Sequence, residues 1–172
     1  EQKQPDIVAL NPMGKLPILT EGDVLVTESA AIGMYLADRH APGRLAPTLD
    51  DPRRGTYLRC CSFAPAVIEP GLMARVAKWD FKESQAGWGN HEAMLTAIES
   101  AIGDGPYLLG DDFSMADIVF GGTVGFMLTF KMLEPRPAFV AYAERLNARP
   151  AAQRAQAKND AIREERGIQI PG

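Results

Sequence analysis

The pattern of hydrophobic and polar residues changes once along the chain, near residue 50. Residues 17–20 and 24–27 are short β-type runs, and the turn-forming segment Glu21-Gly22-Asp23 lies between them. This arrangement predicts an antiparallel β-hairpin. Over residues 29–39 apolar side chains recur instead every three or four positions, which predicts a helix. The first part of the chain is therefore expected to form a β-β-α unit.

A change in composition separates this unit from the rest of the chain. The segment from Ala41 to Pro52 contains three prolines and one glycine and has no helical period, so we interpret it as a linker. Beyond it every periodic segment is helical. We expect one unit over residues 1–40, a linker over 41–50 and an all-helical domain over 51–172.

The helical domain begins with a long amphipathic segment. Apolar residues recur every three or four positions from Tyr57 to Trp79 and include Val76. Pro65 and Pro70 lie inside this segment, and each removes a backbone hydrogen bond. We therefore expect the helix to bend or break in its middle, a feature that can open a cleft beside it.

The later helices have clear boundary signals. A helix over residues 90–102 is expected to stop at Gly103. Ser114 and Asp117 have the spacing of a capping box, which predicts the start of another helix. Further helices are predicted over 137–147, with an apolar stripe, and over 150–165, with a more polar surface.

The helix that follows Ser114 is apolar on all sides over residues 118–130. This pattern places it in the centre of the domain. Gly121, Gly122 and Gly125 each cost about 1 kcal/mol relative to alanine in a helix. We therefore expect neighbouring helices to approach closely at these three positions.

Charge and composition narrow the range of partners. The net charge is −4, and the Lys and Arg residues are scattered, which argues against binding to nucleic acid or to an anionic membrane. The apolar stretch 118–130 is too short to cross a bilayer, which takes roughly 20 residues. Cys60 and Cys61 are adjacent, so a reducing cytoplasm is the expected compartment. Both are expected to pack as small hydrophobes instead of acting as nucleophiles.

The segment from Asn11 to Pro17 is a candidate ligand-binding loop. Two prolines and a glycine within seven residues fix a turn directly before the first strand. The residue before a proline is held extended, so Leu16 can present its backbone to a peptide-like ligand, and Lys15 can pair with a carboxylate. The alternative is a plain loop that leads into an edge strand and carries a solvated lysine.

Glu28 and Ser29 form a second candidate, at the start of the first helix. Unpaired N–H groups and the helix dipole favour an anion there, and the serine hydroxyl can add a hydrogen bond. Glu28 can accept a bond from an amine, so the pair suits the amino-acid end of a ligand. The alternative is that Ser29 or Thr27 only caps the helix.

Together these motifs resemble the glutathione transferase family. The segments that carry the resemblance follow one another in the family's order: Asn-Pro-Met-Gly-Lys-Leu-Pro17, the Glu-Gly-Asp hairpin, Thr-Glu-Ser-Ala-Ala-Ile32, Tyr-Leu36, Pro106-Tyr-Leu-Leu-Gly110 and Phe-Ser-Met-Ala-Asp-Ile118. The resemblance covers nearly the whole chain. It implies an α+β, mostly helical fold, in which the C-terminal part of a thioredoxin-like domain precedes an all-helical bundle.

The resemblance also implies a set of glutathione-binding residues. Leu16 is expected to pair through its backbone with the cysteinyl part of glutathione, and Pro17 is expected to be cis. Glu28 and Ser29 are expected to hold the γ-glutamyl end, and Lys15 to lie near the glycyl carboxylate. Glutathione is the expected co-substrate, and no metal is expected.

The second substrate expected from the resemblance is a small hydrophobic electrophile. It is expected to lie against the first long helix of the helical domain, with Tyr57, Phe63 and Arg75 as candidates for its pocket. A homodimer is the expected assembly.

The family's first strand, first helix and second strand have no counterpart before Glu1. The residue that activates the thiol in the family, a Tyr, Ser or Cys, lies in that part, so no residue of this chain is assigned the task. Three functions follow as hypotheses: conjugation of glutathione to an electrophile, a non-catalytic binding or scaffold role, and glutathione-dependent disulfide or peroxide reduction, which requires an upstream cysteine.

Overall fold

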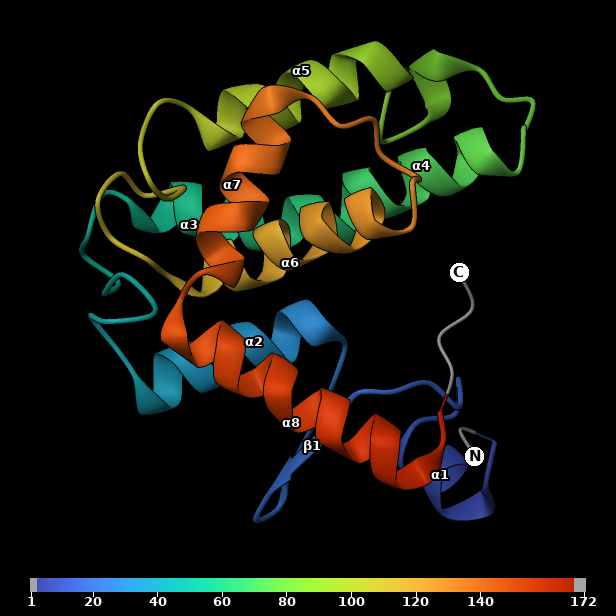
Figure 1. Ribbon diagram of the computed structural model, residues 1–172, viewed down its shortest axis with the longest axis vertical. Helices are drawn as coiled ribbons and strands as arrows, with labels where there is room; N and C mark the ends of the chain where they lie inside the picture. The colour runs from blue at the N-terminus through green and yellow to red at the C-terminus, as the bar shows by residue number, and fades with distance from the viewer. Residues whose placement is uncertain (1–2, 169–172) are drawn as a thin grey trace.

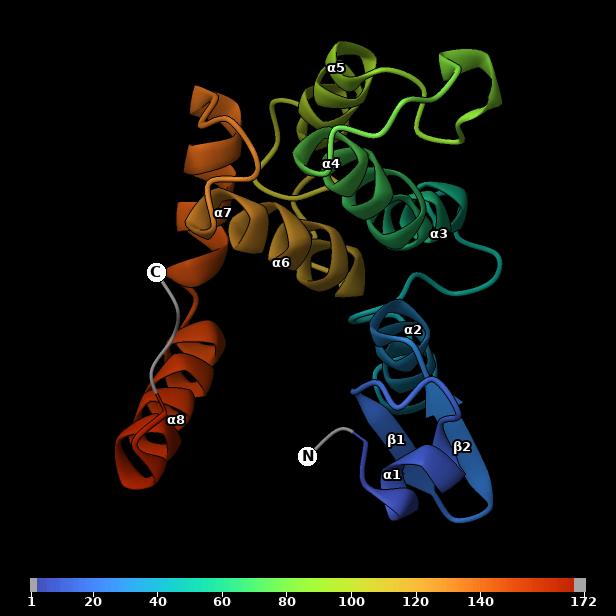
Figure 2. The ribbon, with the colours of Figure 1, turned by 90° about the vertical axis from the view of Figure 1, so that its right-hand side faces the viewer.

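The structure, a computed structural model, describes residues 3–168 and divides them between a small β-β-α unit and a helical bundle (Figures 1 and 2). The predicted hairpin is confirmed: β1 (Ile18–Glu21) and β2 (Val24–Thr27) pair antiparallel. Helix α2 (Ser29–His40) follows, as predicted. A short helix, α1 (Pro5–Leu10), was not predicted, because six residues are too few to show a period.

The bundle contains the predicted helices with small shifts at their ends. In Figure 2, α8 extends away from the bundle on the side opposite the hairpin. The elements of this part are α3 (Arg54–Phe63), the π-helical segment η1 (Ala64–Ile68), α4 (Glu69–Val76), the 3-10 turn η2 (Glu83–Gln85), α5 (His91–Ile102), α6 (Met115–Thr129), α7 (Pro137–Asn147) and α8 (Pro150–Arg166).

The predicted interruption of the long helix is confirmed as a π-helical segment. Between α3 and α4, the N–H of Glu69 bonds to the carbonyl of Ala64, five residues earlier. Pro65 opens this segment, and Pro70 lies in the first turn of α4, so two backbone donors are missing from the α-helical pattern. The expected apolar stripe stops earlier than predicted, because α4 ends at Val76, which is 54% exposed.

The hydrophobic core lies between α3, α5, α6 and α7. Helix α6 crosses the centre of the bundle and packs against both α3 and α7. Cys60 and Cys61 are completely buried and unbonded to each other, which confirms that they pack as small hydrophobes. The largest fully buried side chains are those of Tyr57, Tyr142, Phe120, Phe139, Ile68, Leu72, Met94, Leu95, Ile98 and Val124.

Helix α6 is less enclosed than its sequence predicts. Ile118 and Phe126, which lie two turns apart, are 47% and 55% exposed, so one strip of the helix is left uncovered by residues 3–168. The prediction that a neighbouring helix approaches α6 closely at its glycines is confirmed for Gly121, where a side chain would collide with Leu146 of α7. It is wrong for Gly122, which faces open space.

The capping box at the start of α6 is confirmed and extended by a tyrosine. Asp117 accepts hydrogen bonds from the N–H of Ser114 at 2.8 Å and from the N–H of Leu108 at 2.9 Å. The hydroxyl of Tyr142 on α7 donates a third bond to it at 2.8 Å. The buried carboxylate is thereby satisfied, and one side chain joins α6, α7 and the loop before them.

The segment predicted as a linker is ordered and joins α2 to the bundle. Arg54, at the start of α3, donates to both carboxylate oxygens of Asp38 on α2, at 2.6 and 2.7 Å, and to the carbonyl of Pro47. The carbonyl of Leu45 accepts a bond from the N–H of Met115, the first residue of α6. These contacts fix the position of α2 relative to α3 and α6.

Candidate functional site

The loop before β1 is held by the side chain of a buried asparagine. Asn11 accepts a hydrogen bond from the N–H of Met13 at 3.1 Å and donates one to the carbonyl of Lys15 at 3.0 Å. Its own carbonyl accepts from the N–H of Gly14, which has a positive φ of 57°. The four-residue turn has asparagine in its first position, proline in its second and glycine in its fourth, which is the pattern of a type I turn. The sequence contained this signal, but the role of Asn11 was not inferred.

The loop ends in the expected cis peptide bond. The bond between Leu16 and Pro17 is cis, and both residues are exposed, as is Lys15. Because Asn11 fixes the carbonyl of Lys15, the backbone of Leu16 is presented to solvent in one defined orientation.

The turn between β2 and α2 places Glu28 and Ser29 at the start of a helix. Glu28 is the N-cap residue, and its side chain forms no capping bond. Its φ of 68° and ψ of 120° lie in a region that residues other than glycine rarely occupy, and such residues are found preferentially at functional sites. Ser29 is the first helical residue and not the N-cap, and both side chains are exposed.

These residues border a large groove between α2, the α3–α4 helix and α6. Its volume is about 980 Å³, and Pro17, Glu28 and Ser29 all line it. The structure therefore brings Glu28 and Ser29 to one cavity with Pro17 of the loop motif, whereas Lys15 and Leu16 do not line it. The other lining side chains are mostly apolar: Ala30, Ala31, Ile32, Met34, Leu36, Pro65, Ala66, Met115, Ile118, Val119, Phe126 and Met127.

The charge in the groove is negative. Glu28 and Glu69 are the only charged residues among those that line it, and Ser29, Ser62 and Thr123 supply its hydroxyl groups. The hydroxyl of Thr123 on α6 lies 3.5 Å from a carboxylate oxygen of Glu69. An apolar molecule that enters the groove thus meets carboxylates and hydroxyls as its polar contacts.

The three residues expected to line the electrophile pocket do not line this groove. Tyr57 is completely buried, Phe63 stacks on Phe120 of α6, and Arg75 lies near the end of α4. Tyr57 and Phe63 precede the π-helical segment and belong to the face of α3 that packs in the core, whereas the groove meets a different face of this helix. The residues of this helix that do face the groove are Ser62, Pro65, Ala66 and Glu69.

The buried thiols and the buried tyrosine are poorly suited to nucleophilic chemistry. Burial raises the pKa of Cys61 to about 12 and also raises the pKa of Cys60. The pKa of Tyr57, which lies beside Cys61, is raised chiefly by burial as well. These groups are therefore protonated near neutral pH. Because only the ionised form of a thiol is a good nucleophile, neither cysteine is expected to react readily.

A cluster around Glu21 was not anticipated. Its carboxylate accepts a hydrogen bond from the hydroxyl of Tyr35 at 2.8 Å, forms an ion pair with Arg39 at 3.1 Å and lies 3.2 Å from Nε2 of His40. The hydroxyl of Tyr35, followed by these two partners, holds the pKa of Glu21 below its usual value, although burial opposes the shift. The cluster joins the end of β1 to the second half of α2.

Residues 3–168 contain neither a metal-binding cluster nor a membrane-spanning helix. No group of three or more His, Cys, Asp or Glu side chains is arranged to hold a metal ion there. No helix in that part of the chain is long and apolar enough to cross a membrane.

Comparison with known proteins decides the family. Residues 1–38 match the glutathione S-transferase N-terminal domain, and residues 82–148 match the C-terminal domain. The chain is 30% identical to glutathione S-transferase Z2 of Arabidopsis thaliana over 165 residues, which cover 90% of this chain and 74% of that protein. The chain belongs to the glutathione S-transferase family. The expected fold class, part of a thioredoxin-like domain followed by a helical bundle, is confirmed.

Solved glutathione transferase structures resemble this chain over most of its length. The enzyme from Methylococcus capsulatus is 28% identical, with a TM-score of 0.73 over 91% of this chain and 79% of that one. A homologue from Sulfitobacter, solved with bound glutathione, is 27% identical, with a TM-score of 0.68 over 92% and 80%. A theta-class transferase from Xanthomonas axonopodis, also with glutathione bound, is 28% identical, with a TM-score of 0.64 over 89% and 77%.

Proposed function

We propose that this chain binds glutathione at the edge of the α2–α6 groove and orients it toward an apolar electrophile in the same groove. One observation carries the proposal. Pro17, Glu28 and Ser29, which come from two separate motifs, border a single cavity whose remaining wall is mostly apolar. A cavity of this kind, with a few convergent polar groups, is typical of small-molecule sites.

We call Lys15, Leu16, Pro17, Glu28 and Ser29 the glutathione cradle. Each of its polar groups has a role suited to one part of glutathione. Ser29 and the N-terminal N–H groups of α2 hold the γ-glutamyl carboxylate, and Glu28 accepts bonds from the amino group. The backbone of Leu16 pairs with the cysteinyl amide, and Lys15 lies near the glycyl carboxylate. The Sulfitobacter and Xanthomonas relatives, both solved with glutathione, support glutathione as the ligand of this fold.

The groove also indicates which electrophiles are accepted. Because Glu28 and Glu69 are its only charged lining residues, an anionic substrate would be repelled there. The second substrate is therefore a neutral or cationic apolar molecule. The protein works as a cytoplasmic homodimer in this proposal, as is general in its family.

The residues described here bind and orient glutathione. The hydroxyl groups in the groove belong to Ser29, Ser62 and Thr123, and no tyrosine or cysteine among residues 3–168 lines it. We assign no thiol-activating role to any of these three residues. Binding of glutathione can therefore be measured on this chain directly and separately from turnover.

Calorimetry of glutathione binding to the wild type and to Ser29→Ala tests the binding step. Loss of a hydrogen bond to a charged group is expected to weaken binding by about 1.5 to 3 kcal/mol. Ser100→Ala, at an exposed position on α5, is the matched control and should bind as the wild type does. Equal affinities for Ser29→Ala and the wild type would refute the assignment of Ser29.

Assays with several substrates then separate the three functional hypotheses. Conjugation of glutathione to a neutral chloronitrobenzene is the expected activity, with a rate that rises as the pH approaches the pKa of the bound thiol. Binding of glutathione without turnover of any electrophile, disulfide or peroxide would favour a scaffold role. Reduction of disulfides or peroxides without conjugation would favour the reductase hypothesis.

A further inference from the structure

The Lys15–Leu16 peptide group is the part of the proposed glutathione cradle that contributes through its backbone. Its peptide bond is trans, because the cis bond of this loop is the next one, between Leu16 and Pro17. In a planar trans peptide group the carbonyl oxygen and the N–H point in opposite directions. A contact that fixes the carbonyl of Lys15 therefore also fixes the direction of the N–H of Leu16.

The two ends of this peptide group differ in their contacts. Nδ2 of Asn11 donates a hydrogen bond to the carbonyl of Lys15 at 3.0 Å, and within residues 3–168 no other group bonds to that oxygen. The N–H of Leu16 has no acceptor in the same part of the chain, and Leu16 is 51% exposed. One end is therefore held by a side chain, and the other is a backbone donor that is open to a ligand.

Asn11 is itself fixed by the backbone around it. It directly follows α1, and its N–H bonds to the carbonyl of Ile7 at 2.8 Å. Its Oδ1 accepts a bond from the N–H of Met13 at 3.1 Å, and the residue is only 6% exposed. Because one side-chain atom accepts and the other donates, the amide fits its surroundings in a single orientation. The carbonyl of Lys15 is thus held by a buried group that is anchored on both sides.

The bond to Lys15 is not needed for the turn that precedes it. The turn over residues 11–14 uses the side chain of its first residue as an acceptor, a role that aspartate fills as well as asparagine. The bond from the N–H of Gly14 to the carbonyl of Asn11, at 2.7 Å, closes the turn in either case. The bond to Lys15 requires a donor, which an ionised aspartate lacks. An amide at position 11 therefore acts on the peptide group that follows the turn.

We propose that Asn11 is a positioning residue for glutathione: it holds the Lys15–Leu16 peptide group so that the N–H of Leu16 donates to the carbonyl of the cysteinyl residue. This inference rests on the proposed function, because it takes glutathione as the ligand. Asn11 does not line the α2–α6 groove, so it acts on the ligand only through this peptide group. A donor that is already oriented need not be ordered when the ligand binds, and affinity is higher for that reason.

Calorimetry of glutathione binding to the chain as it stands tests the proposal with two variants. Asn11→Asp keeps the acceptor for the N–H of Met13 and removes the donor to Lys15. Asn11→Ser also keeps an acceptor, adds no charge and is too short to reach the carbonyl of Lys15. Each variant should weaken glutathione binding about tenfold, the loss expected for one hydrogen bond.

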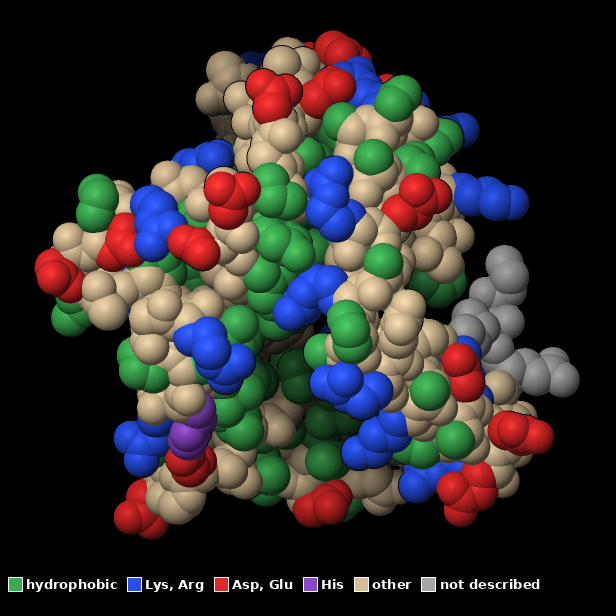
Figure 3. Space-filling view, turned by 60° about the vertical axis from the view of Figure 1, so that its left-hand side comes forward, with side chains coloured by type: hydrophobic (Ala, Val, Ile, Leu, Met, Phe, Trp, Pro, Cys, Tyr) green, Lys and Arg blue, Asp and Glu red, His purple; other side chains and the backbone are tan. Residues whose placement is uncertain are grey.

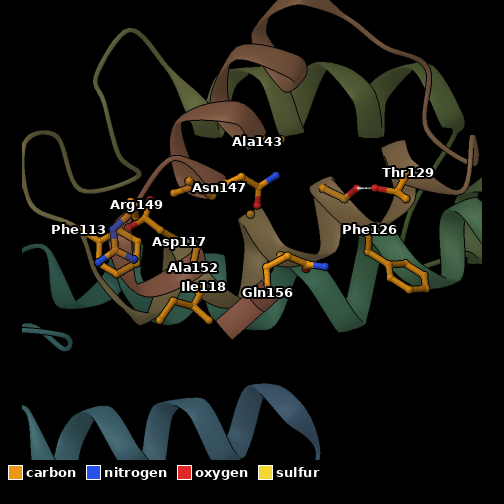
Figure 4. Close-up of a pocket in the computed structure, with 14 residues that line it drawn as sticks. Phe113, Asp117, Ile118, Phe126, Thr129, Ala143, Asn147, Arg149, Ala152 and Gln156 are labelled. Carbon is orange, nitrogen blue, oxygen red and sulfur yellow. Dashed lines mark hydrogen bonds between the residues drawn. The ribbon is translucent and has the colours of Figure 1, made fainter. Parts of the chain in front are cut away.

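Asn147→Asp is the matched control, because it makes the same chemical change elsewhere. Figure 4 shows Asn147 in a crevice between α6, α7 and α8, which no residue of the glutathione cradle lines. Figure 3 shows acidic and basic side chains interspersed over one face of the molecule, and exposed charges of this kind are screened by salt. Asn147→Asp should therefore bind glutathione as the wild type does. An equal loss in this variant would overturn the proposal, because the loss would then not depend on position 11.

A shorter ligand separates positioning from a general loss of structure. γ-Glutamylcysteamine keeps the γ-glutamyl group and the thiol of glutathione but lacks the cysteinyl carbonyl and the glycine. Its affinity, measured by displacement, should be the same in the wild type and in both variants of Asn11. A disordered cradle would bind both ligands more weakly, so equal losses for the two ligands would overturn the proposal. Asn11→Asp should also weaken glutathione binding about tenfold when Lys15 is replaced by Gln, because Asn11 bonds to the backbone of residue 15.

The same titrations distinguish failure of this inference from failure of the proposed function. Glutathione binding that is equal in the wild type, Asn11→Asp and Asn11→Ser would overturn the role of Asn11 and leave the proposed function intact. Absence of glutathione binding by the wild type would overturn the proposed function and this inference with it.

Discussion

The hydroxyl of Tyr35 donates a 2.8 Å hydrogen bond to the carboxylate of Glu21, and this bond joins the middle of α2 to the end of β1. Pro17 precedes β1 and Ser29 begins α2, so the two halves of the proposed glutathione cradle belong to the elements that this bond connects. Arg39 and His40 hold the same carboxylate from the last turn of α2. We therefore expect the geometry of the proposed cradle to depend on a contact that lies outside it.

Tyr35→Phe is expected to loosen the cradle without touching it. The substitution keeps the ring and removes only the hydroxyl, so Glu21 loses one donor and retains its contacts with Arg39 and His40. We expect a lower midpoint of thermal unfolding and weaker glutathione binding. Tyr107→Phe, at a tyrosine in the loop between α5 and α6, is the control. Unchanged glutathione affinity in Tyr35→Phe would contradict the dependence of the cradle on this bond.

The acid stability of the chain is expected to depend on Asp51. The side chain and backbone N–H of Arg53 bond to this carboxylate at 2.7 to 3.2 Å and lower its pKa from 3.8 to about 2. A carboxyl group whose pKa is lower in the folded state stabilises the protein above the unfolded-state pKa. That contribution is lost as the pH falls from about 4 toward about 2.

Urea unfolding of the wild type and Asp51→Asn between pH 2 and pH 6 measures this effect, with the pH range set by the two pKa values. The difference in unfolding free energy should be largest at the upper end of the range and should disappear at the lower end. Asp104→Asn, at an exposed loop position, should show no such trend. A difference that stays constant with pH would show that the ionisation of Asp51 is not linked to folding.

Adjacent glycines of α6 should respond to alanine in opposite directions. A side chain at Gly121 would collide with Leu146 and crowd Tyr142, so Gly121→Ala is expected to destabilise the chain by about 1 to 3 kcal/mol. Gly122 faces open space, so Gly122→Ala should stabilise it by up to about 1 kcal/mol through helix propensity. Urea unfolding of both variants checks the pair. Destabilisation by Gly122→Ala would mean that an unseen element packs against it.

Glu69 is expected to control the charge preference of the second substrate. Two unit charges at 4 Å interact by roughly 1 kcal/mol in water, which corresponds to about a fivefold change in affinity. Glu69→Gln should therefore raise kcat/KM for 4-chloro-3-nitrobenzoate about fivefold relative to the uncharged 4-chloro-3-nitrobenzamide. Glu144→Gln, on α7 and away from the groove, is the control. An unchanged ratio in Glu69→Gln would contradict the assignment.

The parts of the fold that follow from local signals were predicted from the sequence. The hairpin, the start of α2 at Ser29 and the capping box of Ser114 and Asp117 each depend on residues at most a few positions apart. The contacts of Glu21 with Tyr35 and Arg39 were not predicted, because the partners lie 14 and 18 positions away and depend on how the hairpin meets α2.

The candidate site was predicted unevenly for a related reason. Its loop and helix start have residue types that constrain the backbone locally, and the structure brings Pro17 and Ser29 to one groove. The opposite wall depends on the rotation of a helix about its axis. Tyr57 was expected on that wall but is buried, whereas Glu69 faces the groove. Helical periodicity could not locate the change of phase between them.

Because of the π-helical segment from Ala64 to Ile68, the side chains that face the groove depend on the number of residues in this helix as well as on their types. An α-helix turns about 100° per residue, so the wider turn offsets the side chains after it relative to those before it. Substitutions within the segment leave that offset in place. Deleting one residue from it would restore a regular helix and rotate Glu69 and all of α4 by about 100° relative to α3. The number of residues in this segment thus determines which side chains of α4 face the groove. A deletion of one residue would change that wall more than most point mutations.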